Sequence, residues 1–297
     1  MDSLNKKAVV FTFITVLLLT VLIINFLVNL NYRDTQSKIQ SVNVKVDTIN
    51  SFVKSLNSSY IPSALRVSSN DVMIDLLNYE DQSHQYVSNV DNYFIQNLPG
   101  KIQPALNDII SLAAQQGIVI ESIEPQYNTI NLYQTDPWQV IIKLKFNYKL
   151  RDNNNEAIWD IKDRGMLAIL NVDNYRDPLH LVEEDPGFDL KITKILYLSS
   201  YFSDLYNFKK FIENANFTNN PSAPSFLNRL QGEKNLRSAY GIESILDPFY
   251  YTNEQSSSNV DYQYYSPVLV LGLCVKDMPI NFKLDQDHIN YYGREIC

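Results

Sequence analysis

One run of the sequence constrains the fold more than any other: the 25 residues from Ala8 to Tyr32 carry no charge. The apolar part of this run, Ala8 to Leu30, is about 35 Å long as an α-helix, which is enough to cross a bilayer. The run is too long for the hydrophobic part of an ordinary secretory signal, and no A-x-A-like cleavage site follows it. The sequence therefore predicts a transmembrane helix over residues 8–30, and the alternative is a helix buried in a protein core.

The charges around this run predict its orientation. Lys6 and Lys7, together with the amino terminus, make residues 1–7 positive, and short positive segments remain on the cytoplasmic side of a membrane. The rest of the chain then lies outside, so we expect a single-pass protein of the cell membrane whose first partner is the lipid bilayer. The net charge of −8 and the lack of a basic patch in the sequence argue against a nucleic-acid partner.

After the run, apolar residues recur at intervals of three and four, which predicts a helical stalk over residues 31–62. The seam consists of Ile39, Val42, Val46, Ile49, Val53, Leu56 and Tyr60. Such a seam either packs on the chain's own domain or joins a coiled coil with another chain. We favour the first interpretation, because three heptads are short and the flanking positions show no strong charge pattern. Pro62 is expected to interrupt the helix.

Residues 63–297 are predicted to form an extracytoplasmic α+β domain in which helices pack on an antiparallel sheet. In its first part, Asn70 and Ser88 resemble the N-caps of two short helices. The second of these is expected to end before Gly100, and a clearer amphipathic helix runs over residues 102–116.

Alternation of apolar and polar residues takes over from Ile118. Every second residue from Trp138 to Leu150 is apolar, which predicts a long antiparallel strand with one buried face. With its neighbours, this segment predicts a sheet of five or six strands. The other strands are expected at Ile118–Ile123, Tyr127–Tyr133, Ile158–Asp163, Met166–Val172 and Leu190–Leu198.

The second half of the domain has a mixed pattern. A soft boundary is expected near residues 177–187, where two Asp-Pro pairs lie among acidic residues. Beyond it, helices are predicted at Ser203–Asn214, Ala223–Leu230 and Asp285–Tyr292, and strands at Val260–Tyr265 and Val268–Val275.

The sequence contains no motif that indicates a cofactor, a metal centre or catalytic residues. The three histidines, His84, His180 and His288, have no metal-binding spacing, and phosphate-binding loops and nucleophile elbows are absent. His180 precedes acidic residues at 183–185, which form either an oxygen-rich ion site or a solvated loop. We favour the loop, because acidic surface residues commonly occur without an ion.

Four residues are candidates for covalent modification. Cys274 and Cys297 can form a disulfide outside the cell, and the alternative is a buried thiol with a loose terminal one. Asn57 and Asn216 begin glycosylation sequons. Two sequons are no enrichment in a chain as rich in asparagine as this one.

The residues at the start of the apolar run resemble a processing site. Lys7-Ala8-Val9-Val10 is similar to the cleavage site of archaeal type IV pilin-like precursors, in which a basic and a small residue precede the hydrophobic helix. The resemblance implies cleavage after Ala8, a mature chain that starts at Val9, and self-association through the N-terminal helix. Phe13 stands at the fifth mature position, where the bacterial pattern has glutamate. A permanent signal anchor explains the same lysines without cleavage.

Several further motifs follow one another along the chain. They are Asp136-Pro137-Trp138, Trp159, Asp177-Pro178-Leu179, Ala223-Pro224-Ser225-Phe226-Leu227, Arg229-Leu230, Tyr240-Gly241-Ile242-Glu243-Ser244 and Tyr262–Ser266. In this order they resemble a family of uncharacterised single-span archaeal membrane proteins. The resemblance implies a location at the archaeal cell surface and carries no activity.

Most of these motif residues have a structural interpretation, as turn entries or core residues. The tryptophans are expected in the core, and Gly241 is expected to allow a positive φ or a close approach of two backbones. The functional interpretation is a recognition surface formed by Phe226, Arg229 and Glu243. We favour the structural one.

Taken together, these patterns predict a noncatalytic, single-pass, membrane-anchored cell-surface protein with a structural or adhesive role, pilin-like if it is processed. The alternative is a membrane-anchored ectodomain with ligand-binding or hydrolytic activity. That alternative predicts a cleft that contains carboxylates or histidines with shifted pKa values.

Overall fold

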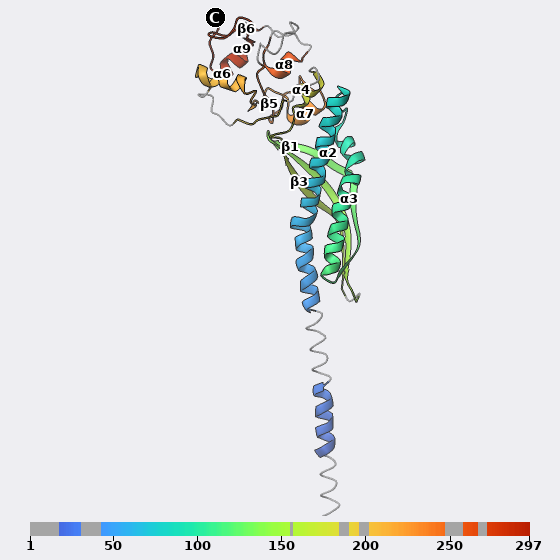
Figure 1. Ribbon diagram of the computed structural model, residues 1–297. Helices are drawn as coiled ribbons and strands as arrows, with labels where there is room; N and C mark the ends of the chain where they lie inside the picture. Colours follow the sequence, from blue (N-terminus) through green and yellow to red (C-terminus); the bar gives the residue numbers. More distant parts are fainter. Residues whose placement is uncertain are drawn as a thin grey trace, which may run out of the picture.

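The computed structural model describes residues 18–30, 43–154, 157–183, 190–195, 202–246, 258–266 and 272–297. Two regions follow the N-terminal helical segments (Figure 1). The helix-sheet region comprises residues 43–172, and the C-terminal region comprises residues 173–297. The candidate processing site at Ala8 and Val9 lies outside the described residues.

Residues 18–30 form a helix whose side chains are all exposed. Within the described part of the chain, no helix is both long and apolar enough to cross a membrane. Because residues 8–17 lie outside that part, the transmembrane helix stays a prediction.

A continuous helical segment runs from residue 43 to residue 83. It comprises residues 43–55, a π-helical turn η1 (Leu56–Tyr60) and α2 (Ile61–Ser83). The prediction that Pro62 interrupts the helix is wrong. The Ile61 N–H bonds to the carbonyl of Leu56, five residues back, and Pro62 lies in the first turn of α2, where a proline is tolerated.

The seam of the predicted stalk packs on the chain's own domain where it is described. Ile49 and Leu56 are buried in the main apolar core, and Val53 packs against it. The favoured interpretation of the seam is therefore confirmed for these residues. Phe52, which lies outside the seam, is buried with them.

The two predicted helices after Ser83 are one helix, α3 (Val90–Gln115). It begins at Asn89, whose side chain accepts a hydrogen bond from the Asn92 N–H at 2.8 Å, so the prediction of Ser88 as N-cap is off by one residue. α3 continues through Pro99 and Pro104. Its buried face explains this continuity, since packing outweighs local helix preference. That face consists of Val90, Phe94, Leu98, Ile102, Leu106, Ile109 and Ala113.

The prediction of Asn70 as an N-cap is also wrong, because Asn70 lies inside α2. Its side chain accepts a hydrogen bond from the Tyr175 hydroxyl at 2.7 Å instead. Gly117 follows α3 with φ +72°, a conformation that favours glycine, and ends the helix as predicted.

The main sheet has three long antiparallel strands in the order β1 (Ile118–Asp136), β2 (Gln139–Asp152) and β3 (Ile158–Asn171). The prediction of five or six strands is wrong. Two pairs of predicted strands are single strands interrupted by register shifts, and the segment at 190–195 forms only isolated bridges. Residues 196–198 of the remaining predicted strand lie outside the described residues.

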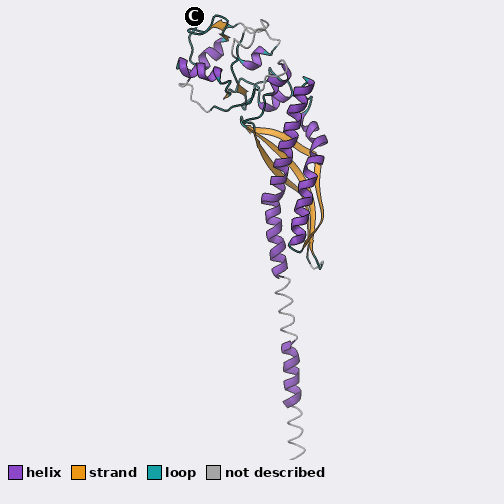
Figure 2. Ribbon diagram, in the orientation of Figure 1, coloured by secondary structure: helices purple, strands orange, loops and turns teal. Residues whose placement is uncertain are grey.

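The alternation predicted for the central strand is confirmed. One face of β2 is buried, and α2 and α3 run along the sheet (Figure 2). The buried residues of β2 are Val140, Ile142, Leu144, Phe146, Tyr148 and Leu150. Trp138, just before β2, is buried as predicted, and Trp159 packs against the same core while its indole N–H donates to Asn50.

The C-terminal region consists of short elements around a second, aromatic core. The elements are α4 (Pro178–Glu183), α6 (Leu205–Glu213), β4 (Thr218–Asn219), α7 (Phe226–Leu230), β5 (Ile242–Glu243), α8 (Asp261–Tyr264), β6 (Leu273–Cys274), β7 (Lys283–Leu284) and α9 (Gln286–Tyr291). β4 pairs with β5 and β6 pairs with β7, both antiparallel. The predicted soft boundary falls on α4, where Leu181 belongs to the first core and Leu179 to the second.

Predictions for the short elements have mixed outcomes. The helix after Asp285 is confirmed, and Asp285 caps it by accepting from the His288 N–H at 2.8 Å. The strand predicted at Val260–Tyr265 is wrong, because those residues contain α8. Only Leu273–Cys274 of the strand predicted at 268–275 is described as a strand.

Candidate functional site

A fully buried arginine, Arg229, belongs to α7 of the C-terminal region. Arg229 Nη1 is 3.1 Å from Asp177 Oδ1 and 2.8 Å from Asp261 Oδ2. α7 presents Arg229, and a capping box formed by Ser225 and Asn228 fixes the start of this short helix. Burial raises the pKa of both carboxyl groups, while the guanidinium opposes that rise.

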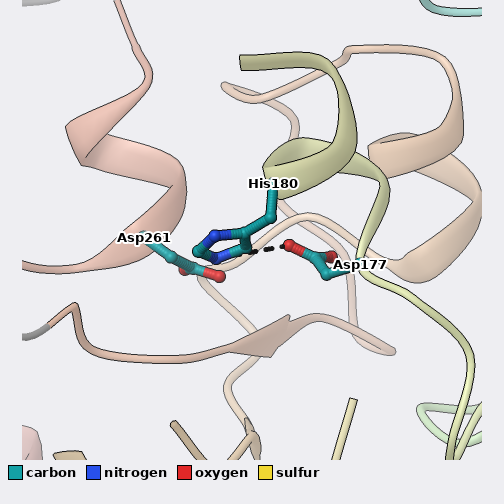
Figure 3. A group of neighbouring side chains, drawn as sticks. All are labelled: Asp177, His180 and Asp261. Atoms are coloured by element: carbon teal, nitrogen blue, oxygen red, sulfur yellow. Dashed lines mark ion pairs between the residues drawn. The ribbon is translucent and has the colours of Figure 1, made fainter. Parts of the chain in front are cut away.

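His180 completes this group (Figure 3). Its Nε2 is 3.6 Å from Asp177 Oδ2, and its Nδ1 is 3.3 Å from the Tyr265 hydroxyl. Burial lowers the pKa of His180 to about 3, so the imidazole is neutral at physiological pH. From the sequence, an ion site of His180 with the acidic residues at 183–185 was the alternative to a solvated loop, whereas the structure places His180 with Asp177 and Asp261.

By residue type, Asp177, His180 and Asp261 can hold a metal ion, since each offers a ligand atom within 4.8 Å of the others. The position of Arg229 argues against this use. Its guanidinium already bonds both carboxylates, and a divalent cation at the same place would be repelled by it. The arrangement fits a buried ion-pair network better than a metal centre.

A second charged group surrounds His288. Nδ1 of His288 is 2.9 Å from both carboxylate oxygens of Asp285, and Nε2 is 3.1 Å from Glu243 Oε2. The Tyr262 hydroxyl lies 3.3 Å from Nε2, and Tyr292 donates to Glu243. Burial alone would lower the pKa of His288, but the two carboxylates outweigh it and raise that pKa to about 10.

The two groups are joined through neighbouring backbone. Arg229 Nη2 donates to the carbonyl of Ile242, the residue before Glu243 in β5. Asp261 and Tyr262 are adjacent in α8, and each contacts one of the groups. The charged residues therefore form one network that ties β5, α7, α8 and α9 together.

The geometry does not provide an acid–base pair for catalysis near neutral pH. General acids and bases work best when their pKa lies near the operating pH. His288 stays charged and His180 stays neutral there, so neither ring readily exchanges a proton at that pH.

A polar cavity of about 310 Å³ opens beside the second group. It is lined by residues from α8 and α9, from the loop between β4 and α7, and from the loop after α7. The lining residues are Asn220, Ser222, Asn235, Arg237, Tyr262, Gln263, Ser266, Asp285, Asp287, His288 and Tyr291. The cleft that the alternative function predicted is thus present around His288, although His288 is locked in a charged state.

The predicted recognition surface of Phe226, Arg229 and Glu243 is wrong, because all three side chains are fully buried. The favoured structural interpretation holds for them. Gly241 allows a close approach, as predicted: a Cβ there would overlap the carbonyl oxygens of Ala223 and Asn220.

The candidate modification sites lie in different surroundings. Cys274 and Cys297 are paired in a disulfide, with Cα atoms 5.7 Å apart. Asn57 is half-buried and accepts a hydrogen bond from the Tyr148 hydroxyl. Asn216 is buried, which argues against a glycan on the folded chain at that position.

Sequence reasoning missed the network because its members are far apart in the chain. A signal was available at Arg229, a charged residue between the apolar residues Phe226 and Leu230 in a predicted helix. Comparisons of the chain with protein-family models, curated proteins and solved structures find no match. The function must therefore be argued from the residues themselves.

Proposed function

We propose that this chain is a noncatalytic, single-pass, membrane-anchored protein of the archaeal cell surface with a structural or adhesive role. The observation that carries the proposal is the helix at residues 18–30. It exposes ten large apolar side chains, each 47–64% exposed. These are Leu18, Leu19, Val21, Leu22, Ile23, Ile24, Phe26, Leu27, Val28 and Leu30.

An apolar surface that surrounds a helix needs lipid or other apolar helices around it. Residues 18–30 belong to the longer uncharged run that starts at Ala8, and that run is long enough to cross a bilayer. Lys6 and Lys7 orient the helix with its start in the cytoplasm. These features support a membrane anchor with residues 31–297 outside the cell.

The long helical segment supports a role in presentation. Residues 43–83 would span about 60 Å as a helix, and the segment packs along the three-stranded sheet. A protein built in this way holds its C-terminal region at the far end of a stiff support. That arrangement suits a structural or adhesive surface protein.

The anchor is tested by membrane extraction of the full chain. Wild-type protein should remain in the membrane pellet after an alkaline carbonate wash. The double variant Leu22→Arg/Ile23→Arg should be released, because each arginine costs about 3 kcal/mol at the centre of a membrane helix. Leu167→Arg is the matched control and should stay in the pellet, since Leu167 is exposed on the sheet. Release of the wild type would refute the anchor.

Whether the protein is pilin-like depends on processing. Mass spectrometry of protein from native membranes gives the mature N-terminus. A chain that starts at Val9 would support assembly through the N-terminal helix. A chain that starts at Met1 or Asp2 would leave a permanent anchor.

The cavity beside His288 favours a second candidate function, that of a membrane-anchored ligand-binding ectodomain. Binding suits the geometry better than hydrolysis, because the histidine in the cavity is held in its charged form by two carboxylates. A membrane anchor and a ligand site are compatible in one chain.

A further inference from the structure

The floor of the cavity beside His288 is formed by buried side chains that other side chains hold in place. His288, Tyr262 and Asn220 are buried at 3–7% exposure, and the Asp285–His288–Glu243 network fixes the imidazole from both sides. Both ring nitrogens of His288 are committed to carboxylates. The ring therefore shapes the floor, and its position changes little when a ligand enters.

Polar groups around this floor are left unused by the protein. In the described part of the chain, no hydrogen bond involves Asn220 Nδ2, Asn235 Nδ2, the Arg237 guanidinium or the Asp287 carboxylate. Asn220 and Asn235 do use their side-chain oxygens, which accept from the Ser222 N–H and the Ser266 hydroxyl. The amide orientations are thus fixed, and their NH2 groups remain available as donors.

The charges and polar groups of the lining disfavour three kinds of ligand. A metal ion is disfavoured by Arg237 and by the charged His288. A strongly anionic ligand is disfavoured by Asp285 and Asp287, which line the same cavity. An apolar ligand is disfavoured because almost every lining side chain carries a polar group.

The remaining class is a neutral ligand with many hydroxyl groups. A hydroxyl both donates and accepts, so it can pair with amide donors, with the guanidinium and with the Asp287 carboxylate at once. Tyr291 is half-buried in the lining and adds an aromatic ring, with an apolar face for the carbon side of a sugar. A volume of about 310 Å³ lies at the small end of ligand sites.

We propose that the cavity between α8, α9 and the loops after β4 and α7 binds a saccharide unit. Asn220, Asn235 and Arg237 supply donors, Asp287 supplies an acceptor, and the charged network below holds the floor. The inference rests on the second candidate function, ligand binding, and does not depend on the membrane anchor.

The test uses the full chain in lipid nanodiscs and saturation-transfer NMR with four monosaccharides: glucose, galactose, mannose and N-acetylglucosamine. At least one should give a saturable signal at or below about 10 mM, as single-unit ligands bind with Kd near 1 mM. Arg237→Ala and Asn235→Ala should each weaken that binding about tenfold. Both residues are exposed, so their replacement leaves the core intact. Arg164→Ala, at an exposed arginine on β3, is the matched control and should bind as wild type.

Three outcomes would overturn the inference: no signal from any sugar, binding that survives both cavity substitutions, or loss of binding in the Arg164 control alone. Sulfate added as an anionic probe should not compete, and competition by sulfate would indicate an anion site instead. Membrane extraction reports separately on the anchor, so failure here leaves that result unaffected.

Discussion

The helix-sheet region and the C-terminal region are stabilised in different ways. Among the described residues, the helix-sheet region buries two acidic side chains, Glu80 and Asp152. The C-terminal region buries six acidic, arginine or histidine side chains: Asp177, His180, Arg229, Glu243, Asp261 and His288. The first region relies on long elements with apolar faces, and the second on ion pairs between short ones.

Element length explains the difference. Long helices satisfy most of their own backbone groups, long paired strands satisfy those of their neighbours, and both present continuous apolar faces. Elements of two to nine residues, as in the C-terminal region, leave backbone groups at every end, so side chains must bond them, as Arg229 does with the carbonyl of Ile242. We expect the C-terminal region to be more sensitive to the loss of one polar group.

The largest effect is expected from Arg229→Met. It leaves Asp177 and Asp261 buried without their cation, which costs about 3–5 kcal/mol of unfolding free energy. Urea unfolding of the full chain in detergent measures this loss. The triple variant Arg229→Met/Asp177→Asn/Asp261→Asn should recover at least half of it. A loss below about 1 kcal/mol in the single variant would contradict the role of the network.

Leu144→Ala tests the apolar core of the other region. Leu144 is fully buried in β2, so the cavity should cost about 2–5 kcal/mol. Leu167→Ala, at a half-exposed leucine of β3, should change stability by no more than about 0.5 kcal/mol. Equal losses of stability in the two variants would mean that the two faces of the sheet do not differ in burial as described.

Glu80→Gln should stabilise the protein. Burial raises the pKa of Glu80 to about 9, although the Val87 N–H donates to Oε1; Oε2 has no hydrogen-bond partner in the described structure. The neutral form contributes stability that is full below pH 4.5 and is lost as pH rises through 9. Glutamine keeps the neutral acceptor, so the gain at pH 7 should reach about 1–3 kcal/mol.

Unfolding measured at several pH values tests the predicted direction of this pH dependence. The gain from Glu80→Gln should shrink toward pH 4.5 and grow toward pH 9. The stability of the Glu80→Gln variant should still decline between pH 6.5 and 10. The reason is that the raised pKa of His288 also contributes stability that is lost as the pH rises. A variant less stable than wild type at pH 8 would show that Glu80 is ionised in the folded chain.

The smallest effect is expected from Lys210→Ala. Lys210 pairs with Glu213 at 2.9 Å, but both side chains are about half exposed. Exposed pairs of this kind contribute little to stability, and less at high salt. Thermal unfolding in low and high salt measures the difference. A loss as large as that of Leu144→Ala would mean that surface pairs contribute to the C-terminal region as buried ones do.

The sequence predicted the parts of the fold that depend on the periodic spacing of apolar residues. Alternation identified β2, and the apolar spacing identified the buried face of α3. It failed where packing overrides local signals: Pro62 and Gly100 suggested breaks in helices that continue because their faces are buried. The number of strands was overestimated because register shifts inside a strand resemble turns.

The candidate site was harder to predict for a different reason. Asp177, Arg229 and Asp261 come from three distant segments, and nothing local indicates that they meet. Alternation at 260–265 suggested a strand where α8 forms, because four residues are too few to establish a helical period. The His288 cavity depends on such tertiary pairings, so only its cap, Asp285, was visible in the sequence.

The central claim, an anchored protein with its α+β domain outside, is tested most directly by lysine mapping. Cells that express the full chain are treated intact with a membrane-impermeant amine reagent, and modified lysines are located by mass spectrometry. We predict modification at the exposed Lys162 and Lys276, 72% and 56% exposed, and none at Lys6 or Lys7. Modification of Lys162 and Lys276 only after lysis would contradict the account, because it would place the domain inside the cell.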